Sequence, residues 1–179
     1  SSPNRVLHVE GTASTFGDTQ SILQISDDTA MAAGVGGGIS FTGKATTGQS
    51  DSNTMFAAIH AEKENATSGN TSGALLFSTR TNGSNPAERM RIDSSGLVGI
   101  GTSPASGINL HLHEAGSGQM LMAFTNDTTG TGSNDGLHVG IDSSENAFVY
   151  NKENTALYFG TNNTERMRID SSGNVGIGT

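Results

Sequence analysis

The chain has 179 residues, a formal net charge of −8, 25 glycines, 5% aromatic residues and no Cys or Trp. The acidic balance argues against nucleic-acid binding, which requires a basic surface, and the lack of Cys excludes disulfides and thiolate metal sites. Large apolar side chains supply most of the burial energy of a core. Because they are so few here, we expect several copies to associate. No run of 18 apolar residues occurs, so we expect no membrane insertion.

Short alternating or apolar segments separated by Gly, Ser, Asn and Asp predict an all-β chain. In chain order, we expect strands in the first half at 21–26, 37–43, 55–62 and 74–79. In the second half we expect them at 120–126, 136–141, 147–151 and 156–161. No segment longer than about ten residues keeps the helical period.

The glycine-rich stretch Gly34–Gly38 has two interpretations. A phosphate-binding loop is followed by a helix and, in P-loop proteins, contains a Lys-Ser/Thr pair. Here the β-like segment ISFTG follows instead. We therefore interpret the glycines as a site of close strand packing or as a flexible loop.

One fifteen-residue phrase occurs twice, as ERMRIDSSGLVGIGT at 88–102 and as ERMRIDSSGNVGIGT at 165–179. Each copy predicts a β-hairpin with a Ser-Ser-Gly turn, in which Gly can take a positive φ. Alternation places apolar residues on one hairpin face and charged residues or Gly on the other. We expect the apolar face to lie inside an assembly and the glycines to admit another backbone closely. The residues concerned are Met90, Ile92, Val98, Gly99, Ile100 and Gly101, with Met167, Ile169, Val175, Gly176, Ile177 and Gly178.

The similarity between the two halves extends beyond the phrase. ALLFST (74–79) matches ALYFGT (156–161), and SPNRVLHVEG (2–11) resembles SPASGINLHLHEAG (103–116). Self-similarity of this kind is typical of units that stack end to end. The sequence therefore predicts two tandem β-modules, residues 1–102 and 103–179.

RMRIDSSGNVGIGT, with ALLFSTRTNGSNPA and TALYFGTN before its two copies, resembles shaft modules of bacteriophage and prophage tail fibres and tailspikes. The similarity covers nearly the whole chain. It implies an elongated, intertwined homotrimeric β-structure in the virion, outside the cell, that spaces or presents a host-recognition tip. No nucleophile-elbow pattern such as G-x-S-x-G occurs, and we expect no enzyme and no catalytic residues.

His111 and His113 flank Leu112 and would point to one side of a strand. The resemblance includes trimeric fibre tips that hold iron through His-x-His motifs, so three copies could offer six imidazoles to one axial metal ion. The matching residues of the first module are His8 and Glu10. The pair is therefore not part of the repeat, and solvated histidines are the simpler interpretation. We expect no other cofactor.

Other functions remain open from the sequence. Ser/Thr/Asn-rich loops could bind a host glycan or protein directly. Asp27-Asp28 and Glu62/Glu64 could be the paired carboxylates of a tailspike depolymerase, although solvated carboxylates are far more common. A trimeric bacterial adhesin would need the same elongated structure. The phrase arginines are bracketed by acids, which predicts salt bridges; they are Arg89, Arg91, Arg166 and Arg168.

Overall fold

The computed structural model describes residues 24–47 and 54–178. These residues form twelve β-strands and no helix, so the prediction of an all-β chain is confirmed for them. The chain divides into two compact units, Ser1–Leu112 and His113–Thr179. The division lies beyond the module boundary predicted at 102/103, because a strand that follows the first phrase pairs with the first sheet.

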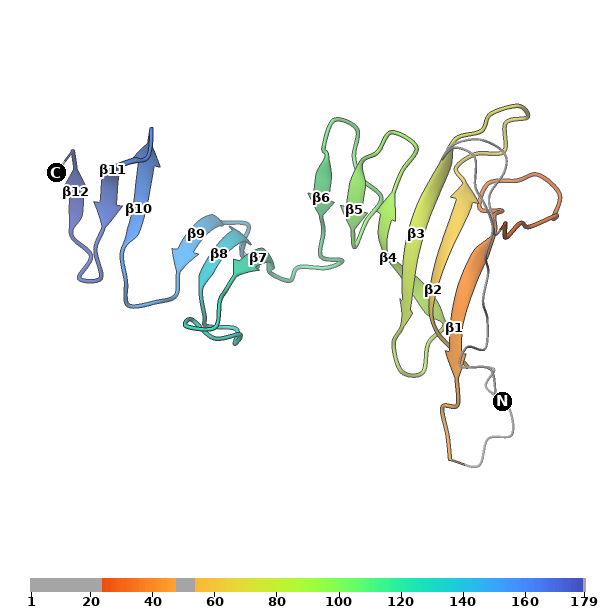
Figure 1. Ribbon diagram of the computed structural model, residues 1–179, viewed down its shortest axis with the longest axis horizontal. Helices are drawn as coiled ribbons and strands as arrows, with labels where there is room; N and C mark the ends of the chain where they lie inside the picture. Colours follow the sequence, from red (N-terminus) through yellow and green to blue (C-terminus); the bar gives the residue numbers. More distant parts are fainter. Residues whose placement is uncertain (1–23, 48–53, 179) are drawn as a thin grey trace, which may run out of the picture. The chain divides into compact units, whose positions relative to one another are not determined.

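The first unit is a six-stranded sheet whose strands lie side by side in chain order (Figure 1). They are β1 (Gly38–Gly43), β2 (Thr54–Lys63), β3 (Gly73–Arg80), β4 (Pro86–Ile92), β5 (Val98–Ile100) and β6 (Leu110–Leu112). Neighbouring strands are antiparallel except β5 and β6, which are parallel. A parallel pair cannot be joined by a tight turn, and residues 101–109 make the longer connection.

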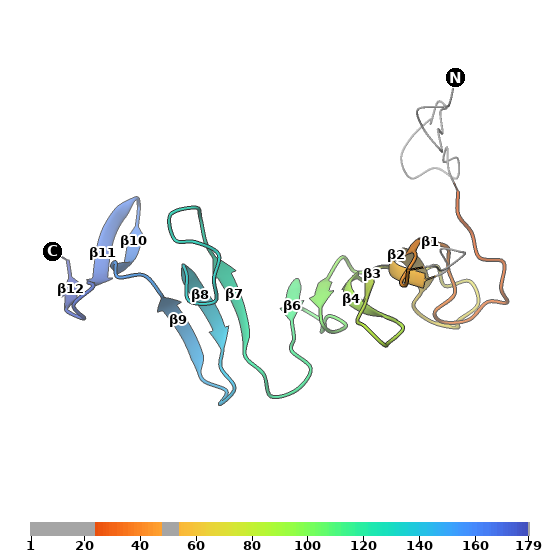
Figure 2. The ribbon, with the colours of Figure 1, turned by 90° about the horizontal axis from the view of Figure 1, so that it is seen from below.

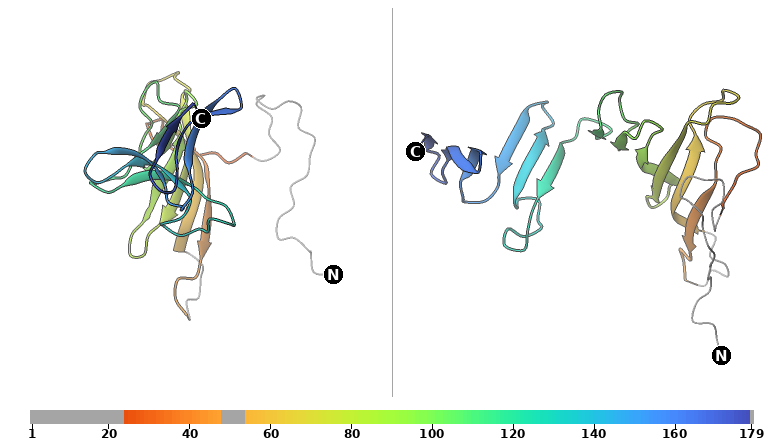
Figure 3. Two further views of the ribbon diagram at one scale, coloured as in Figure 1. Left: turned by 90° about the vertical axis from the view of Figure 1, so that its left-hand side faces the viewer. Right: turned by 45° about the horizontal axis from the view of Figure 1, so that its top comes forward.

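The second unit contains two three-stranded antiparallel sheets, each again in chain order (Figures 2 and 3). The first is formed by β7 (Met120–Phe124), β8 (Leu137–Ile141) and β9 (Ala147–Asn151). The second is formed by β10 (Leu157–Thr161), β11 (Thr164–Ile169) and β12 (Val175–Ile177). Both phrase hairpins are present, as β4–β5 and β11–β12.

The strands expected from 37–43 onward are confirmed, with ends that differ by at most two residues. The strand expected at 21–26 is not. Residues 24–26 form no strand, and 21–23 lie outside the described residues. The backbone of Ile25 instead passes close to the glycine-rich stretch. A Cβ built on Gly37 would lie 2.1 Å from the carbonyl oxygen of Ile25. Close packing is thus the interpretation that the structure supports for these glycines.

One face of the six-stranded sheet is apolar across all its strands. Residues directly opposite one another in a ladder share a face, and the register forms two continuous apolar rows. The first row is Ile39, Ile59, Phe77, Met90, Ile100 and Leu112. The second row is Ala61, Leu75, Ile92, Val98 and Leu110.

The opposite face of this sheet carries the small core of the unit. Ala74 and Leu76 on β3 are the only buried hydrophobic residues in the described part of the chain, and Ser78 is buried beside them. Arg91 lies opposite Leu76, and Glu62 lies opposite Ala74. The ion pair between Arg91 and Glu62 therefore crosses β3 above these residues.

Candidate assembly surface

The exposed apolar faces of the sheets are the most prominent surface feature of the described chain. Several large side chains of the two rows in the first unit are exposed, among them Ile39, Ile59, Leu75, Ile100 and Leu110. Monomeric soluble proteins rarely expose large contiguous apolar patches, and such patches mark interaction sites. The predicted phrase residues Met90, Ile92, Val98 and Ile100 lie together in the middle of this face.

The second phrase reproduces the same arrangement residue for residue. Met90 lies opposite Phe77 and Ile100, and Met167 lies opposite Phe159 and Ile177. Ile92 lies opposite Leu75 and Val98, and Ile169 lies opposite Leu157 and Val175. Even the β-bulge is shared, since the register shifts after Phe77 in one copy and after Phe159 in the other.

The sheet β7–β8–β9 has a comparable apolar face, although its sequence does not contain the phrase. Met122, Val139 and Val149 form one row across it, and Met120 and Ile141 lie in the next. The opposite face is partly covered by the chain itself. His138 is buried there, with Nε2 3.1 Å from the carbonyl oxygen of Asp135.

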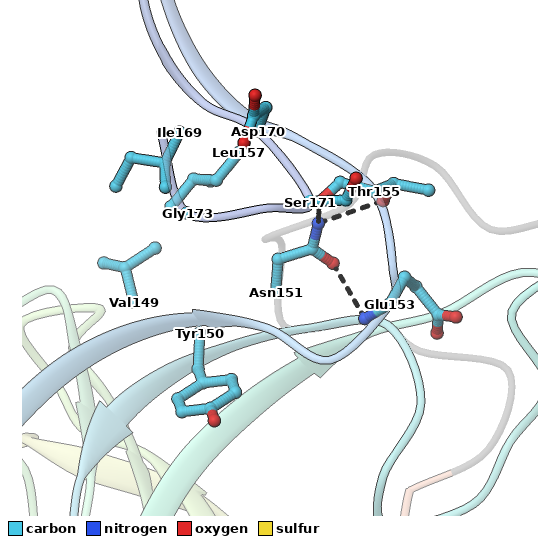
Figure 4. A pocket seen from close by; sticks show the side chains of 10 residues that line it. All are labelled: Val149, Tyr150, Asn151, Glu153, Thr155, Leu157, Ile169, Asp170, Ser171 and Gly173. Atoms are coloured by element: carbon cyan, nitrogen blue, oxygen red, sulfur yellow. Dashed lines mark hydrogen bonds between the residues drawn. The ribbon is translucent and has the colours of Figure 1, made fainter. Parts of the chain in front are cut away.

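A recess of about 420 Å³ lies where the apolar faces of the two sheets of the second unit approach each other (Figure 4). Val149, Leu157 and Ile169 line it, together with Tyr150, whose ring points away from these three side chains. Asn151 fixes its rim, because the amide nitrogen donates to Thr155 Oγ1 at 3.0 Å and the amide oxygen accepts from Glu153 N at 3.1 Å. Apolar side chains of both sheets and polar groups of the neighbouring turns together line the recess.

The glycines of the phrase have roles within the single chain. A Cβ on Gly99 would lie 2.1 Å from the carbonyl oxygen of Thr102, so the backbone that approaches closely is that of the same chain. Gly101 and Gly178 have φ values of 77° and 69°, a region that residues with a side chain seldom occupy. These two glycines are needed for the local conformation of the backbone.

Each phrase turn is held by an aspartate. Asp93 Oδ1 accepts hydrogen bonds from Ser95 N and Leu97 N, and Asp170 Oδ1 accepts from Ser172 N and Asn174 N, all at 2.9 Å. Asn174, which replaces Leu97, adds a hydrogen bond from its side-chain amide to Asp170 Oδ2 at 2.9 Å. Hydrogen bonds from Asn174 lower the pKa of Asp170.

A third copy of this turn lies between β8 and β9, and the sequence comparison missed it. Asp142 Oδ1 accepts from Ser144 N and Asn146 N at 2.8 and 2.9 Å, and hydrogen bonds from Asn146 lower its pKa. The fourth turn residue is Glu145 with φ 68°, where the phrase copies have Gly96 and Gly173 with φ 78° and 84°. The signal was present, since Ile-Asp-Ser-Ser occurs at 92–95, 141–144 and 169–172.

The predicted salt bridges form within each phrase. Arg91 binds Glu88 through Nε and Nη2, both at 2.7 Å, and Arg168 binds Glu165 in the same way. These hydrogen bonds raise the pKa of both arginines and lower the pKa of both glutamates. Arg89 and Arg166 instead donate from Nε to a threonine hydroxyl, that of Thr79 or Thr161.

The candidate metal ligands lie at the end of the first sheet. His111 is on β6 opposite Gly99, on the face away from Leu110 and Leu112, and its Nδ1 accepts a hydrogen bond from Ala105 N at 3.3 Å. His113 follows the strand. Within the described residues of one chain, no group of three or more His, Asp or Glu side chains could hold a metal ion. A site shared by three chains stays a prediction.

Three of the acidic residues considered for glycoside hydrolysis make structural contacts. Asp27 accepts from Thr29 and Gly36 N, Glu62 binds Arg91, and Glu64 accepts from Ser94 N at 2.9 Å. These three carboxylates thus hold a turn, a loop or a neighbouring strand in place.

No known protein family and no curated protein matches the chain. No helix in the described residues is long and apolar enough to cross a membrane.

Proposed function

We propose that the chain is a structural segment of a homotrimeric bacteriophage tail fibre, which spaces or presents a host-recognition tip. Three chains would pack their apolar sheet faces around a common axis. The sequence resemblance supports the assignment to tail fibres, and the exposed apolar faces support the association of several chains.

The observation that carries the proposal is the recurrence of one uncovered apolar face in the same register in both units. Burial of apolar surface contributes roughly 25 cal/mol per Å², and a single-layer sheet obtains little of it from its own chain. A partner with the same repeat would match the rows of both units at once. Closed symmetric association of like chains is the usual solution for soluble assemblies.

Sedimentation equilibrium of the purified chain tests the assembly. We expect a mass of about 55 kDa, three times the chain mass of 18.3 kDa, which is consistent with closed homo-oligomers. A monomer at micromolar concentration would contradict the proposal.

Two adjacent residues of β10 provide a matched pair of variants. Phe159 lies on the apolar face and is 49% exposed, and Tyr158 lies on the opposite face and is 66% exposed. Because both are exposed in one chain, Phe159→Asp and Tyr158→Asp should perturb a monomer similarly. We expect Phe159→Asp to prevent association, since it would bury an unpaired charge, and Tyr158→Asp to preserve it. Equal behaviour of the two variants would count against the apolar face as the contact surface.

Direct receptor binding is the second candidate, and the polar loop after β7 favours it. Asn126 Oδ1 accepts from Thr128 N and Thr129 N at 2.9 and 3.0 Å, and Asp135 Oδ2 accepts from Gly132 N at 2.6 Å. A loop that is preorganised on a sheet is a suitable recognition element. Binding of the assembled segment to a glycan array or to whole cells would favour this function over a spacer.

A further inference from the structure

The turn between β3 and β4 contains the one Asn-Gly pair of the sequence, Asn82-Gly83 (Figure 1). Ser84 N donates to Thr81 O at 3.1 Å, so this pair occupies the two central positions of the turn. Arg89 Nη2 donates to Thr81 Oγ1 at 3.0 Å and holds the base of the turn. The pair itself is exposed, and glycine places no side chain beside its own backbone nitrogen. The nitrogen of Gly83 is therefore sterically open to the side chain of Asn82.

Neither of these two groups is held by the rest of the described chain. Gly83 N donates no hydrogen bond there, and the side-chain amide of Asn82 makes none. A Cβ built on Gly83 would meet nothing within 4 Å. By contrast, Asn70, in the turn between β2 and β3, accepts a hydrogen bond from Ser72 N to its Oδ1 at 2.8 Å. The side chain of Asn82 is thus free to rotate toward the nitrogen of the next residue.

Two cations lie beside the same pair. A recess of about 440 Å³ next to the turn is lined by Asn82 and Gly83 together with Lys44, Arg80 and Phe56. Neither Lys44 nor Arg80 has a carboxylate within salt-bridge distance among the described residues. Positive charge stabilises negative charge that develops on a nearby nitrogen or oxygen atom. The recess therefore favours loss of the Gly83 N–H proton and attack of this nitrogen on the Asn82 amide.

We infer that Asn82 is a self-modification site, which the chain converts to aspartate or isoaspartate without an enzyme. Gly83 N loses its proton and bonds to Cγ of Asn82, the Cγ–Nδ2 bond breaks, and the amide nitrogen leaves as ammonia. Water then opens the resulting five-membered succinimide ring at either carbonyl. The net reaction consumes one water and releases one ammonia, so it requires no oxidant or reductant. The new carboxylate would lie in the recess with Lys44 and Arg80 and supply the acidic partner that they lack.

The one Asp-Gly pair of the sequence, Asp135-Gly136, shows how the fold opposes the same ring closure. Gly136 is buried, and its N–H donates to Glu153 Oε1 at 2.7 Å. Asp135 Oδ2 accepts a hydrogen bond from Gly132 N at 2.6 Å. Both the nitrogen and the carboxylate are therefore held in place, and the negative charge of Glu153 opposes loss of the Gly136 proton. We expect this pair to remain unchanged under conditions in which Asn82 reacts.

The test is incubation of the full chain in mildly alkaline buffer made with heavy-oxygen water, followed by trypsin digestion and mass spectrometry. Trypsin recovers Asn82 in the peptide of residues 81–89. We expect this peptide to exchange the amide nitrogen for one heavy oxygen atom over days. Fragment ions should place the change at Asn82 and not at Asn85, because Pro86 after it has no N–H. Two eluting forms are expected, of which isoaspartyl methyltransferase labels one.

Asn82→Gln is the matched variant, because a glutamine would have to close a six-membered ring, which forms far more slowly. We expect it to lose conversion at least tenfold and to keep the melting temperature. The double variant Lys44→Gln and Arg80→Gln retains the Asn-Gly pair and should convert severalfold more slowly.

Absence of conversion at Asn82, or conversion no faster than that of Asn70 in the same digest, would overturn the inference. An unchanged rate in the double variant would overturn the role assigned to the two cations. The reaction requires only one chain, so its outcome is separate from the tests of association.

Discussion

Arg91 Nη2 lies 2.9 Å from Glu62 Oε1, so a guanidinium on β4 reaches across β3 to a carboxylate on β2. Ala74 and Leu76 lie on β3 beneath this ion pair. In the second unit no strand lies beyond β10, and the corresponding Arg168 has only Glu165 within salt-bridge distance among the described residues. The two units thus contain the same arginine in two different environments.

Replacement of Arg91 by Ala should destabilise the first unit. The side chain is 17% exposed, and its removal would uncover Leu76 and leave two carboxylates unpaired, which we expect to cost about 1–3 kcal/mol. The measurement is the free energy of unfolding in denaturant.

Arg168→Ala is the matched control for this variant. Its side chain is 48% exposed, and exposed ion pairs contribute little, so we expect a melting temperature close to that of the unmodified chain. If both variants lost the same stability, the crossing of β3 would have no special role.

The third turn offers a stabilising substitution. Glu145 has φ 68°, a left-handed conformation that costs a residue with a side chain roughly 1–2 kcal/mol. Glycine loses more chain entropy on folding, so Glu145→Gly should give a net gain of about 0.5–1 kcal/mol. Thermal melting of the variant measures this gain, and we expect a higher melting temperature than that of the unmodified chain.

The reverse change tests the same cause in the second phrase. A Cβ on Gly173 would meet nothing within 4 Å, and the residue has φ 84°, so only the backbone conformation opposes a side chain there. We expect Gly173→Glu to lower the melting temperature. If neither variant changed the melting temperature, backbone strain at this position would not distinguish the stabilities of the two turns.

The aspartates of the turns predict an acid-dependent stability. Hydrogen bonds lower the pKa of Asp142 and Asp170 in the folded chain, whereas an unfolded Asp titrates near 3.9. Above that value both states are ionised and the contribution is complete. As the pH falls below it, the unfolded state takes up protons first, so stability decreases through the folded pKa.

Melting temperatures measured between pH 6 and pH 2 should therefore fall most steeply below about pH 4. In the double variant Asp142→Asn and Asp170→Asn, the fall should be shallower, because two of the linked carboxylates are absent. Glu88 and Glu165 would still contribute, since arginine hydrogen bonds lower the pKa of both. An unchanged slope would exclude the turn aspartates as its cause.

The axial metal hypothesis competes with packing of the apolar faces around the axis, because His111 lies on the opposite face of its sheet from Leu110 and Leu112. It predicts about one metal ion per three chains, six-coordinated by His111 and His113 of each chain. A ligand that binds only the folded assembly stabilises it, so a chelator should lower the melting temperature. Elemental analysis of protein purified without an affinity tag is the direct measurement. Less than a tenth of an equivalent, with no effect of chelator, would assign both histidines to the strand surface.

The sequence was sufficient to predict most strands because alternation is a local property, and the repeat phrase predicted the hairpin twice. It could not predict the pairing of β6, because a three-residue strand reached by a long connection has no local signature. Glu145 concealed the third turn, since a Gly was expected where φ is positive. The close contact at Gly99 was expected from the sequence, but the partner, Thr102 of the same chain, depends on how residues 101–104 fold back.

The strand order also bears on how the chain reaches its native state. In all three sheets each strand pairs with its neighbour in the sequence, so the contacts within a chain have low contact order, which favours rapid folding. Hairpins form within microseconds, whereas association of subunits takes milliseconds to minutes and depends on concentration. For an assembly of the proposed kind, refolding would begin with a fast phase independent of protein concentration. A slower phase would follow, accelerating with concentration, during which the apolar faces are open to aggregation.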